Sequence, residues 1–98
     1  MRYEIVLAPQ AVESLRALPA FDRSAVRDAL ETHLRHEPAR VSKSRIKRLR
    51  GLDRPQYRLR INDIRVFYDI TKEEVQILAI VTKAEAESWL RAHGQATP

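Results

Sequence analysis

The sequence contains no cysteine and only two glycines, Gly51 and Gly94. The lack of cysteine excludes disulfide bridges and thiolate metal sites. A phosphate-binding loop needs several closely spaced glycines, and this chain does not have them. No apolar run approaches the ~20 residues of a membrane-spanning helix. The first four residues do not have the layout of a signal peptide either. We therefore expect a cytoplasmic protein with no metal site, no small-molecule cofactor and no membrane partner.

The length and composition indicate one compact domain. The chain has 98 residues, of which 44% are hydrophobic and 32% charged. This length suits a single domain that can bury one modest core. We expect the domain to span residues 1–93. We expect residues 94–98 to form a disordered tail, because chain ends are ordered only when something holds them.

Positive charge is concentrated in one segment of the chain. Residues 40–65 hold ten Lys or Arg and two acids, a net charge of +8, whereas the other 72 residues carry −3. This distribution favours a polyanionic partner such as nucleic acid. The alternative is a solvated surface loop. Within the segment, we expect residues 40–54 to be a flexible basic approach, which contributes mainly salt-sensitive attraction.

The hydrophobic pattern predicts an α+β fold of order β-α-α-β-β-β with a short C-terminal helix. Alternation over 2–7 predicts a strand, and apolar residues spaced by three or four predict two helices, separated at Pro19 and ended at Pro38. Three further strands follow, at 57–61, 64–70 and 75–81, and 84–92 is expected to be helical. Consecutive strands with short turns indicate an antiparallel meander, on which the helix hairpin buries its apolar face.

The turn at Asn62-Asp63 predicts the pairing across the first hairpin of this meander. A two-residue turn sets Ile61 opposite Ile64 and Arg60 opposite Arg65. One face of the hairpin then carries Tyr57, Leu59, Ile61, Ile64, Val66 and Tyr68. The other face carries Arg58, Arg60, Arg65 and Phe67. The first set is expected to pack on the helices, because a shift of one residue would turn the arginines into the core.

The arginines on the second face indicate an anion site. Like charges directly opposite each other destabilise a sheet, by up to ~1 kcal/mol, and a bound anion would relieve this. Guanidinium groups bind phosphate oxygens in pairs and stay charged, and Phe67 beside them is a candidate platform for a nucleobase. The alternatives are that the arginines extend into solvent, or that acids elsewhere neutralise them. Asp69 is the nearest acid on the hairpin.

Lys83 and Trp89, which follow the hairpin in sequence, each have two interpretations. Trp89 is either an anchor of the last helix in the core or a platform for a base. Lys83 follows the last strand and is either a surface lysine or a cation that reaches the arginines. The three histidines have no spacing that indicates a metal site or a catalytic pair.

Residues 47–52 (Lys-Arg-Leu-Arg-Gly-Leu) and 57–68 (Tyr-Arg-Leu-Arg-Ile-Asn-Asp-Ile-Arg-Val-Phe-Tyr) resemble a pattern of the RelE/ParE toxins, K-x-L-x-G followed by YRLRxGDYRVxY. The opening strand and the first helix are also similar to the start of that family. The resemblance extends over about residues 2–90. It implies the toxin of a type II toxin–antitoxin pair, with an antitoxin as its partner.

RelE-like members cleave mRNA on the ribosome, using the message's own 2′-OH as nucleophile. The resemblance therefore implies a ribosome-dependent mRNA endoribonuclease, with ribosome and mRNA as further partners. By position, Arg58, Arg60 and Arg65 match the basic catalytic residues of the family, and Lys83 is the basic residue nearest to the arginine that usually follows the last strand. The expected RNA-binding residues are Lys43, Arg45, Lys47, Arg48, Arg50 and Phe67.

The C-terminal region departs from the RelE-like pattern. Its aromatic residue is Trp89, which cannot serve as a general acid or base, so Lys83 or a crowded guanidinium is left to protonate the leaving oxygen. Two alternatives follow from this departure: a ParE-like inhibitor of DNA gyrase that is not an enzyme, and a plain RNA-binding module.

Overall fold

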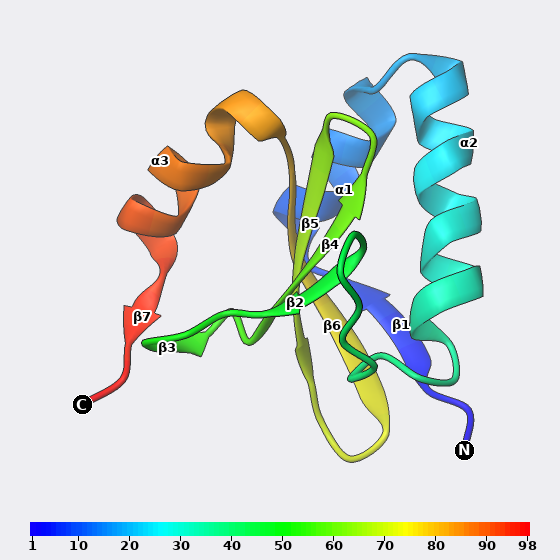
Figure 1. Ribbon diagram of the computed structural model, residues 1–98. Helices are drawn as coiled ribbons and strands as arrows, with labels where there is room; N and C mark the ends of the chain where they lie inside the picture. Colours follow the sequence, from blue (N-terminus) through cyan, green and yellow to red (C-terminus); the bar gives the residue numbers. More distant parts are fainter.

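The structure is a computed structural model that describes all 98 residues. A five-stranded sheet of order β1-β6-β5-β4-β2 forms its centre, with α1 and α2 on one side and α3 on the other (Figure 1). The elements are β1 (Glu4–Leu7), α1 (Pro9–Ala17), α2 (Ala20–Ala29), the π-helical turn η1 (Leu30–Leu34), β2 (Ile46–Arg48), β3 (Leu52–Arg54), β4 (Tyr57–Ile61), β5 (Ile64–Ile70), β6 (Glu74–Thr82), α3 (Lys83–His93) and β7 (Gln95–Ala96). None of the helices combines the length and apolar character that crossing a membrane requires. The predicted α+β class is confirmed.

The helix hairpin forms where the sequence predicts it and covers the core face of the sheet. Pro9 occupies the first turn of α1, where its missing N–H leaves no bond unmade, and Pro19 caps the start of α2. The most deeply buried apolar side chains from the helices are Ala11, Val26 and Leu34. They pack against Leu59, Val66, Tyr68, Val75 and Ile77 of the sheet. This single core ties the hairpin of β4 and β5 to the helices.

The turn between β4 and β5 produces the predicted register. Asn62 has φ of 52°, a left-handed conformation that asparagine adopts more readily than most residues. Tyr57 pairs with Tyr68, Leu59 with Val66, and Arg60 with Arg65. Strand alternation then sends the apolar set into the core and the arginines to the opposite face.

The basic segment, residues 40–54, contributes two strands, β2 and β3, which differs from the flexible approach expected. β2 lies at the edge of the sheet, where buried Ile46 sits opposite Leu59. One apolar residue among charges produces no visible periodicity, so the sequence pattern did not indicate this strand. The expected disordered tail also differs, because Gln95–Ala96 of β7 pair with β3.

Candidate nucleic-acid interface

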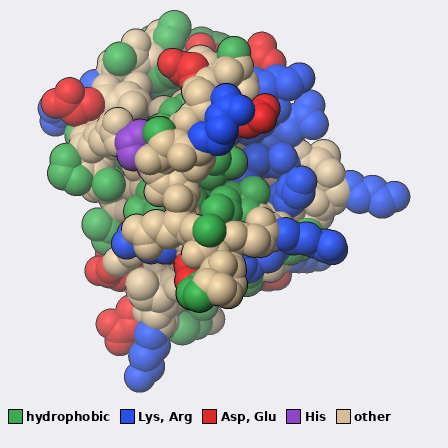
Figure 2. All heavy atoms as spheres, turned by 90° about the vertical axis from the view of Figure 1, so that its left-hand side faces the viewer, with side chains coloured by type: hydrophobic (Ala, Val, Ile, Leu, Met, Phe, Trp, Pro, Cys, Tyr) green, Lys and Arg blue, Asp and Glu red, His purple; other side chains and the backbone are tan.

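Four cations share the sheet face opposite α1 and α2. Arg60 lies opposite Arg65, and Lys47 of β2 lies opposite Arg58 of β4. Because opposed residues in antiparallel strands point to the same side, these four side chains define what we call the arginine face: Lys47, Arg58, Arg60 and Arg65. Figure 2, which looks at the α3 side of the molecule, shows Lys and Arg side chains gathered along one flank beside hydrophobic groups.

Arg65 is held in place by the hairpin turn. It is only 7% exposed, and its Nη1 donates to the carbonyl oxygens of Asn62 at 2.8 Å and Ile64 at 3.1 Å. Burial, followed by the charge of Arg60, lowers the pKa of Arg65, while Asp63 acts in the opposite direction. The guanidinium is therefore fixed in position and not fully compensated by its surroundings.

Arg58 and Arg60 have no acidic partner. None of the ion pairs in the structure includes Arg58, Arg60 or Arg65. The Nε of Arg58 is shielded from solvent and makes no hydrogen bond. Burial, then the charges of Arg65 and Arg60, lower the pKa of Arg58. A buried donor without an acceptor is costly, and an anion beside Arg58 and Arg60 would supply both an acceptor and the missing negative charge.

Asp69 does not neutralise the arginine face. Its carboxylate, 5% exposed, accepts from Nε of Arg54 at 2.7 Å and from the backbone N–H of Gln56 at 2.8 Å. The side-chain Oε1 of Gln56 in turn accepts from the N–H of Ile70 at 2.9 Å. Asp69 thus anchors the segment between β3 and β4, which leaves the arginines unpaired.

Replacing Asp69 with alanine should lower the free energy of unfolding by about 1–3 kcal/mol, because the Gln56 N–H loses its acceptor and Arg54 its partner. The expected loss of stability is moderate because the Arg54 side chain is 48% exposed and water screens its charge. Urea unfolding followed by circular dichroism measures the change. The matched control is Asp53→Ala at an exposed position of the same segment, with an expected change within ~0.5 kcal/mol. Equal midpoints for the two variants would contradict the anchoring role.

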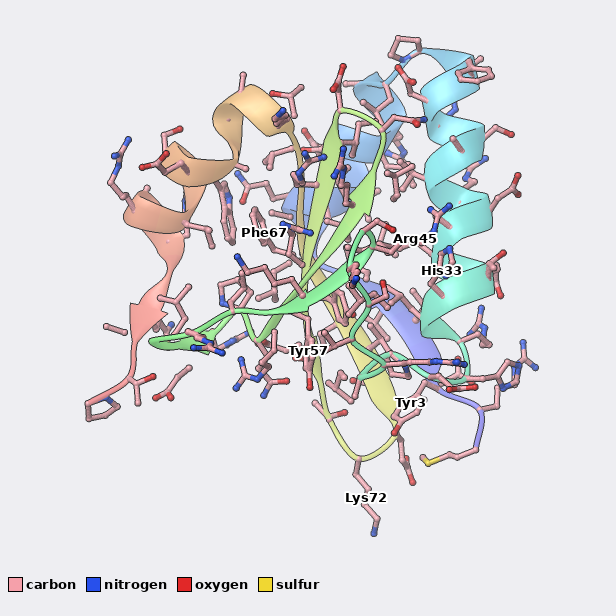
Figure 3. The ribbon with its side chains drawn as sticks, viewed as in Figure 1. Tyr3, His33, Arg45, Tyr57, Phe67 and Lys72 are labelled. Carbon is pink, nitrogen blue, oxygen red and sulfur yellow. The ribbon has the colours of Figure 1, made fainter.

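Phe67 lies on the predicted face, yet it is covered by the last helix. Its ring stacks on Trp89 with centroids 5.2 Å apart, and it is 1% exposed. Trp89 stacks in turn on His93 at 4.8 Å. Figure 3 shows Phe67 projecting toward α3. In this structure α3 occupies the space that a base stacked on Phe67 would need, and stacking on a base stays a prediction. Trp89 is the anchor of α3.

Lys83 is the first residue of α3 and adjoins the same turn as Arg65. Its backbone N–H donates to the carbonyl oxygen of Asp63 at 2.6 Å, and its side chain is exposed. Thr82 and Glu85 form a reciprocal capping box that fixes where α3 begins. The helix start and the hairpin turn are thus joined, which brings Lys83 to the end of the arginine face that carries Arg65.

The remaining predicted RNA-binding residues have different local surroundings. Lys43 and Arg50 are exposed on loops. Arg48 lies over the ring of Tyr57 at 5.2 Å and donates to the Gln56 carbonyl at 2.7 Å. Arg45 lines a separate cleft with residues of η1. The feature missed from the sequence is that β2 places Lys47 beside Arg58. The only signal for it was the single apolar Ile46 in a charged run.

Known proteins with this fold are toxins of type II toxin–antitoxin systems. The family model described as "ParE toxin of type II toxin-antitoxin system, parDE" matches residues 5–87. Among solved structures, the archaeal RelE–RelB complex from Pyrococcus horikoshii is similar at 28% identity and TM-score 0.64, covering 85% of this chain and 97% of that one. The toxin–antitoxin complex RelBE2 from Mycobacterium tuberculosis is similar at 26% identity and TM-score 0.65, covering 84% and 99%.

The isolated E. coli RelE toxin shares the fold at 19% identity and TM-score 0.64, covering 93% of this chain and 99% of that one. Among curated proteins, none matches the sequence. The family model covers most of the chain, including the strands β4 and β5 that carry the arginines. The chain belongs to the ParE toxin family, within the RelE/ParE superfamily of toxins of type II toxin–antitoxin systems.

Proposed function

We propose that this toxin is a ribosome-dependent mRNA endoribonuclease that acts in the cytoplasm. The observation that carries the proposal is the arginine face, where three guanidinium groups lie together without an acidic partner. A surface of this kind binds and orients a phosphodiester, because each guanidinium can donate two hydrogen bonds to phosphate oxygens. The similar structures from P. horikoshii and M. tuberculosis are both toxin–antitoxin complexes that include RelE-type toxins.

The proposed reaction is an attack of the 2′-oxygen of one nucleotide on the adjacent phosphorus. The P–O5′ bond breaks, leaving a 2′,3′-cyclic phosphate and a 5′-hydroxyl. The proton of the 2′-OH passes to solvent or a base, and the leaving 5′-oxygen takes up a proton. Negative charge grows on the phosphate oxygens in the transition state, and the cations Arg60 and Arg65 stabilise it there more than in the substrate.

Lys83 is proposed to protonate the leaving oxygen. It is the cation that follows the last strand, and its backbone is bonded to the same hairpin turn that holds Arg65. Arg58 and Lys47 then contact neighbouring phosphates on the strand. The messenger RNA is presented by the ribosome, which supplies the single-stranded substrate.

The partner that keeps such a toxin inactive is a cognate antitoxin. The P. horikoshii and M. tuberculosis complexes pair a toxin of this fold with an antitoxin protein. An acidic segment of the antitoxin would satisfy the arginine face by the same charge pairing that binds RNA, so antitoxin and RNA would compete for it.

The second candidate function is inhibition of DNA gyrase. One observation favours it: the family model that matches this chain describes the ParE toxin of the parDE pair. A ParE-like inhibitor of DNA gyrase would act by binding a protein and would not need guanidinium groups directed at a phosphate. The third alternative, a plain RNA-binding module, would bind messages without cutting them.

Sequencing of mRNA ends after brief induction in cells separates the three functions. The endoribonuclease predicts new 5′-hydroxyl ends inside translated codons, and these ends should vanish when ribosomes are first cleared from the message. A gyrase inhibitor would instead leave mRNA intact while plasmid supercoiling falls. Intact mRNA and normal supercoiling together with RNA retention on the purified protein would identify a binding module.

A further inference from the structure

A polar cleft of about 490 Å³ lies between η1 and the loop that leads into β2, outside the arginine face. Eight residues line it, and Ile46 is the hydrophobic one. The others are Thr32, His33, His36, Glu37, Arg40, Ser42 and Arg45. Figure 3 shows Arg45, just before β2, on the side of η1 that carries His33. The function proposed above makes no use of this cleft.

Three sets of hydrogen bonds fix the loop that forms the cleft. The buried hydroxyl of Tyr68 donates to the carbonyl oxygen of Pro38 at 2.7 Å. Ser42 Oγ accepts from the N–H groups of Arg45 at 3.1 Å and Ile46 at 3.3 Å. The N–H of Arg60 donates to the Arg45 carbonyl at 2.8 Å. The loop is therefore shaped before any ligand arrives, which lowers the entropic cost of binding.

The charge of the cleft favours an anion. Arg40 and Arg45 stand against one acid, Glu37, which pairs with Arg40 at 3.4 Å with both side chains largely exposed. The Arg45 side chain has no acidic partner in the structure. With neutral histidines the cleft carries one net positive charge.

The connection to the arginine face identifies the ligand. Arg45 and Lys47 are two residues apart at the edge of the sheet, with Lys47 opposite Arg58 on the arginine face and Arg45 in the cleft. Successive phosphates of an extended nucleic-acid strand can follow the sheet edge formed by β2. The cleft has one apolar lining residue, whereas a peptide-binding groove relies on apolar anchors. We infer that this cleft binds a further phosphodiester of the RNA strand, which passes around β2 from the arginine face. The identity of the strand as RNA rests on the proposed function.

His33 reports on occupancy of the cleft. Burial, and secondly the positive charge of Arg45, lower the pKa of His33 below its ordinary value. The charged and titratable groups that line the cleft with it are Arg40 and Arg45 from the loop before β2, and His36 and Glu37 from the turn after η1. A phosphate held between His33 and Arg45 adds the opposite charge, so the pKa of His33 should rise when the cleft is filled.

The test uses the full-length protein with an Arg60→Ala change and NMR of the His33 imidazole. Inorganic phosphate and a short 2′-O-methyl RNA strand, which has no free 2′-OH to attack, are the two probes. We expect both to raise the pKa of His33, and expect Arg45→Ala to abolish the rise. The matched control is Arg16→Ala, which removes an exposed arginine from α1. In addition, Arg45→Ala should reduce the slope of log affinity against log salt by about 0.7 for one lost phosphate contact.

An unchanged pKa of His33 with both probes would overturn the inference. So would a response to an acidic peptide without any response to RNA, since the cleft would then belong to a protein partner. The change in the pKa of His33 does not depend on whether the protein cleaves RNA. If the toxin leaves mRNA intact in cells while His33 still responds to the RNA strand, the proposed cleavage fails and the phosphate site stands.

Discussion

Replacing Arg60 with alanine is expected to reduce RNA cleavage by about 10²–10³-fold, the usual effect of removing one preorganised group that stabilises transition-state charge. Arg60 is exposed and makes no side-chain hydrogen bond or ion pair in the structure. Its loss should therefore leave the core unchanged. Ribosome-bound mRNA cleavage under single-turnover conditions measures the rate.

Two further variants show whether the effect on cleavage comes from charge position. Arg60→Lys keeps the charge and loses the paired donors, so cleavage should recover in part. Arg16→Ala removes the same charge from α1 and should leave the rate unchanged. The stability of Arg60→Ala should stay level or rise by up to ~1 kcal/mol, because Arg65 loses a like charge opposite it. Full cleavage by a folded Arg60→Ala protein would remove Arg60 from the site.

Arg65 is a less informative position for the same experiment. Its guanidinium donates to two carbonyl oxygens of the turn and is 7% exposed, so Arg65→Ala would affect the hairpin as well as the charge. A double change of Arg60 and Arg65 to alanine should abolish toxicity, but its stability would include the lost turn bonds. The single Arg60→Ala change removes a charge from the site without removing the hydrogen bonds of the turn.

Replacing Phe67 with alanine should lower the free energy of unfolding by about 3–5 kcal/mol, a large fraction of the stability of a small domain. Phe67 is 1% exposed and stacks on Trp89, so the change leaves a cavity between the sheet and α3. Thermal and urea unfolding of the purified toxin measure the loss.

A conservative change at Phe67 separates packing from base stacking. Phe67→Leu retains most of the apolar volume and should cost less than half as much stability as Phe67→Ala, with RNA cleavage within a few-fold of the unchanged protein. Trp89→Phe should behave similarly, because it preserves the stack on Phe67. If Phe67→Leu stays folded and RNA affinity collapses, the ring contacts a base and α3 must move away from the sheet on binding.

Local patterns along the chain were enough to predict that Arg58, Arg60 and Arg65 share a face, but not that Lys47 joins them. Strand alternation has a period of two, and the Asn62-Asp63 turn adds two residues, so the pairing of Arg60 with Arg65 follows from adjacent sequence. The two helices and the apolar strand β6 follow from periodicity and from Pro9 and Pro19 in the same way. None of these features depends on what the distant parts of the chain do.

Only the tertiary structure decided what surrounds that face. Phe67 is covered because α3 folds back over the sheet, and Asp69 pairs with Arg54 because residues fifteen apart in sequence meet between β3 and β5. Arg45 turns into the histidine cleft because β2 joins the edge of the sheet. These contacts are set by packing between segments that are remote in sequence, and charge and periodicity within one segment carry no information about them. The sequence by itself therefore determined the fold class and the three arginines that share a face. The packed fold added Lys47 to them and decided which side chains on that face stay open to a phosphate.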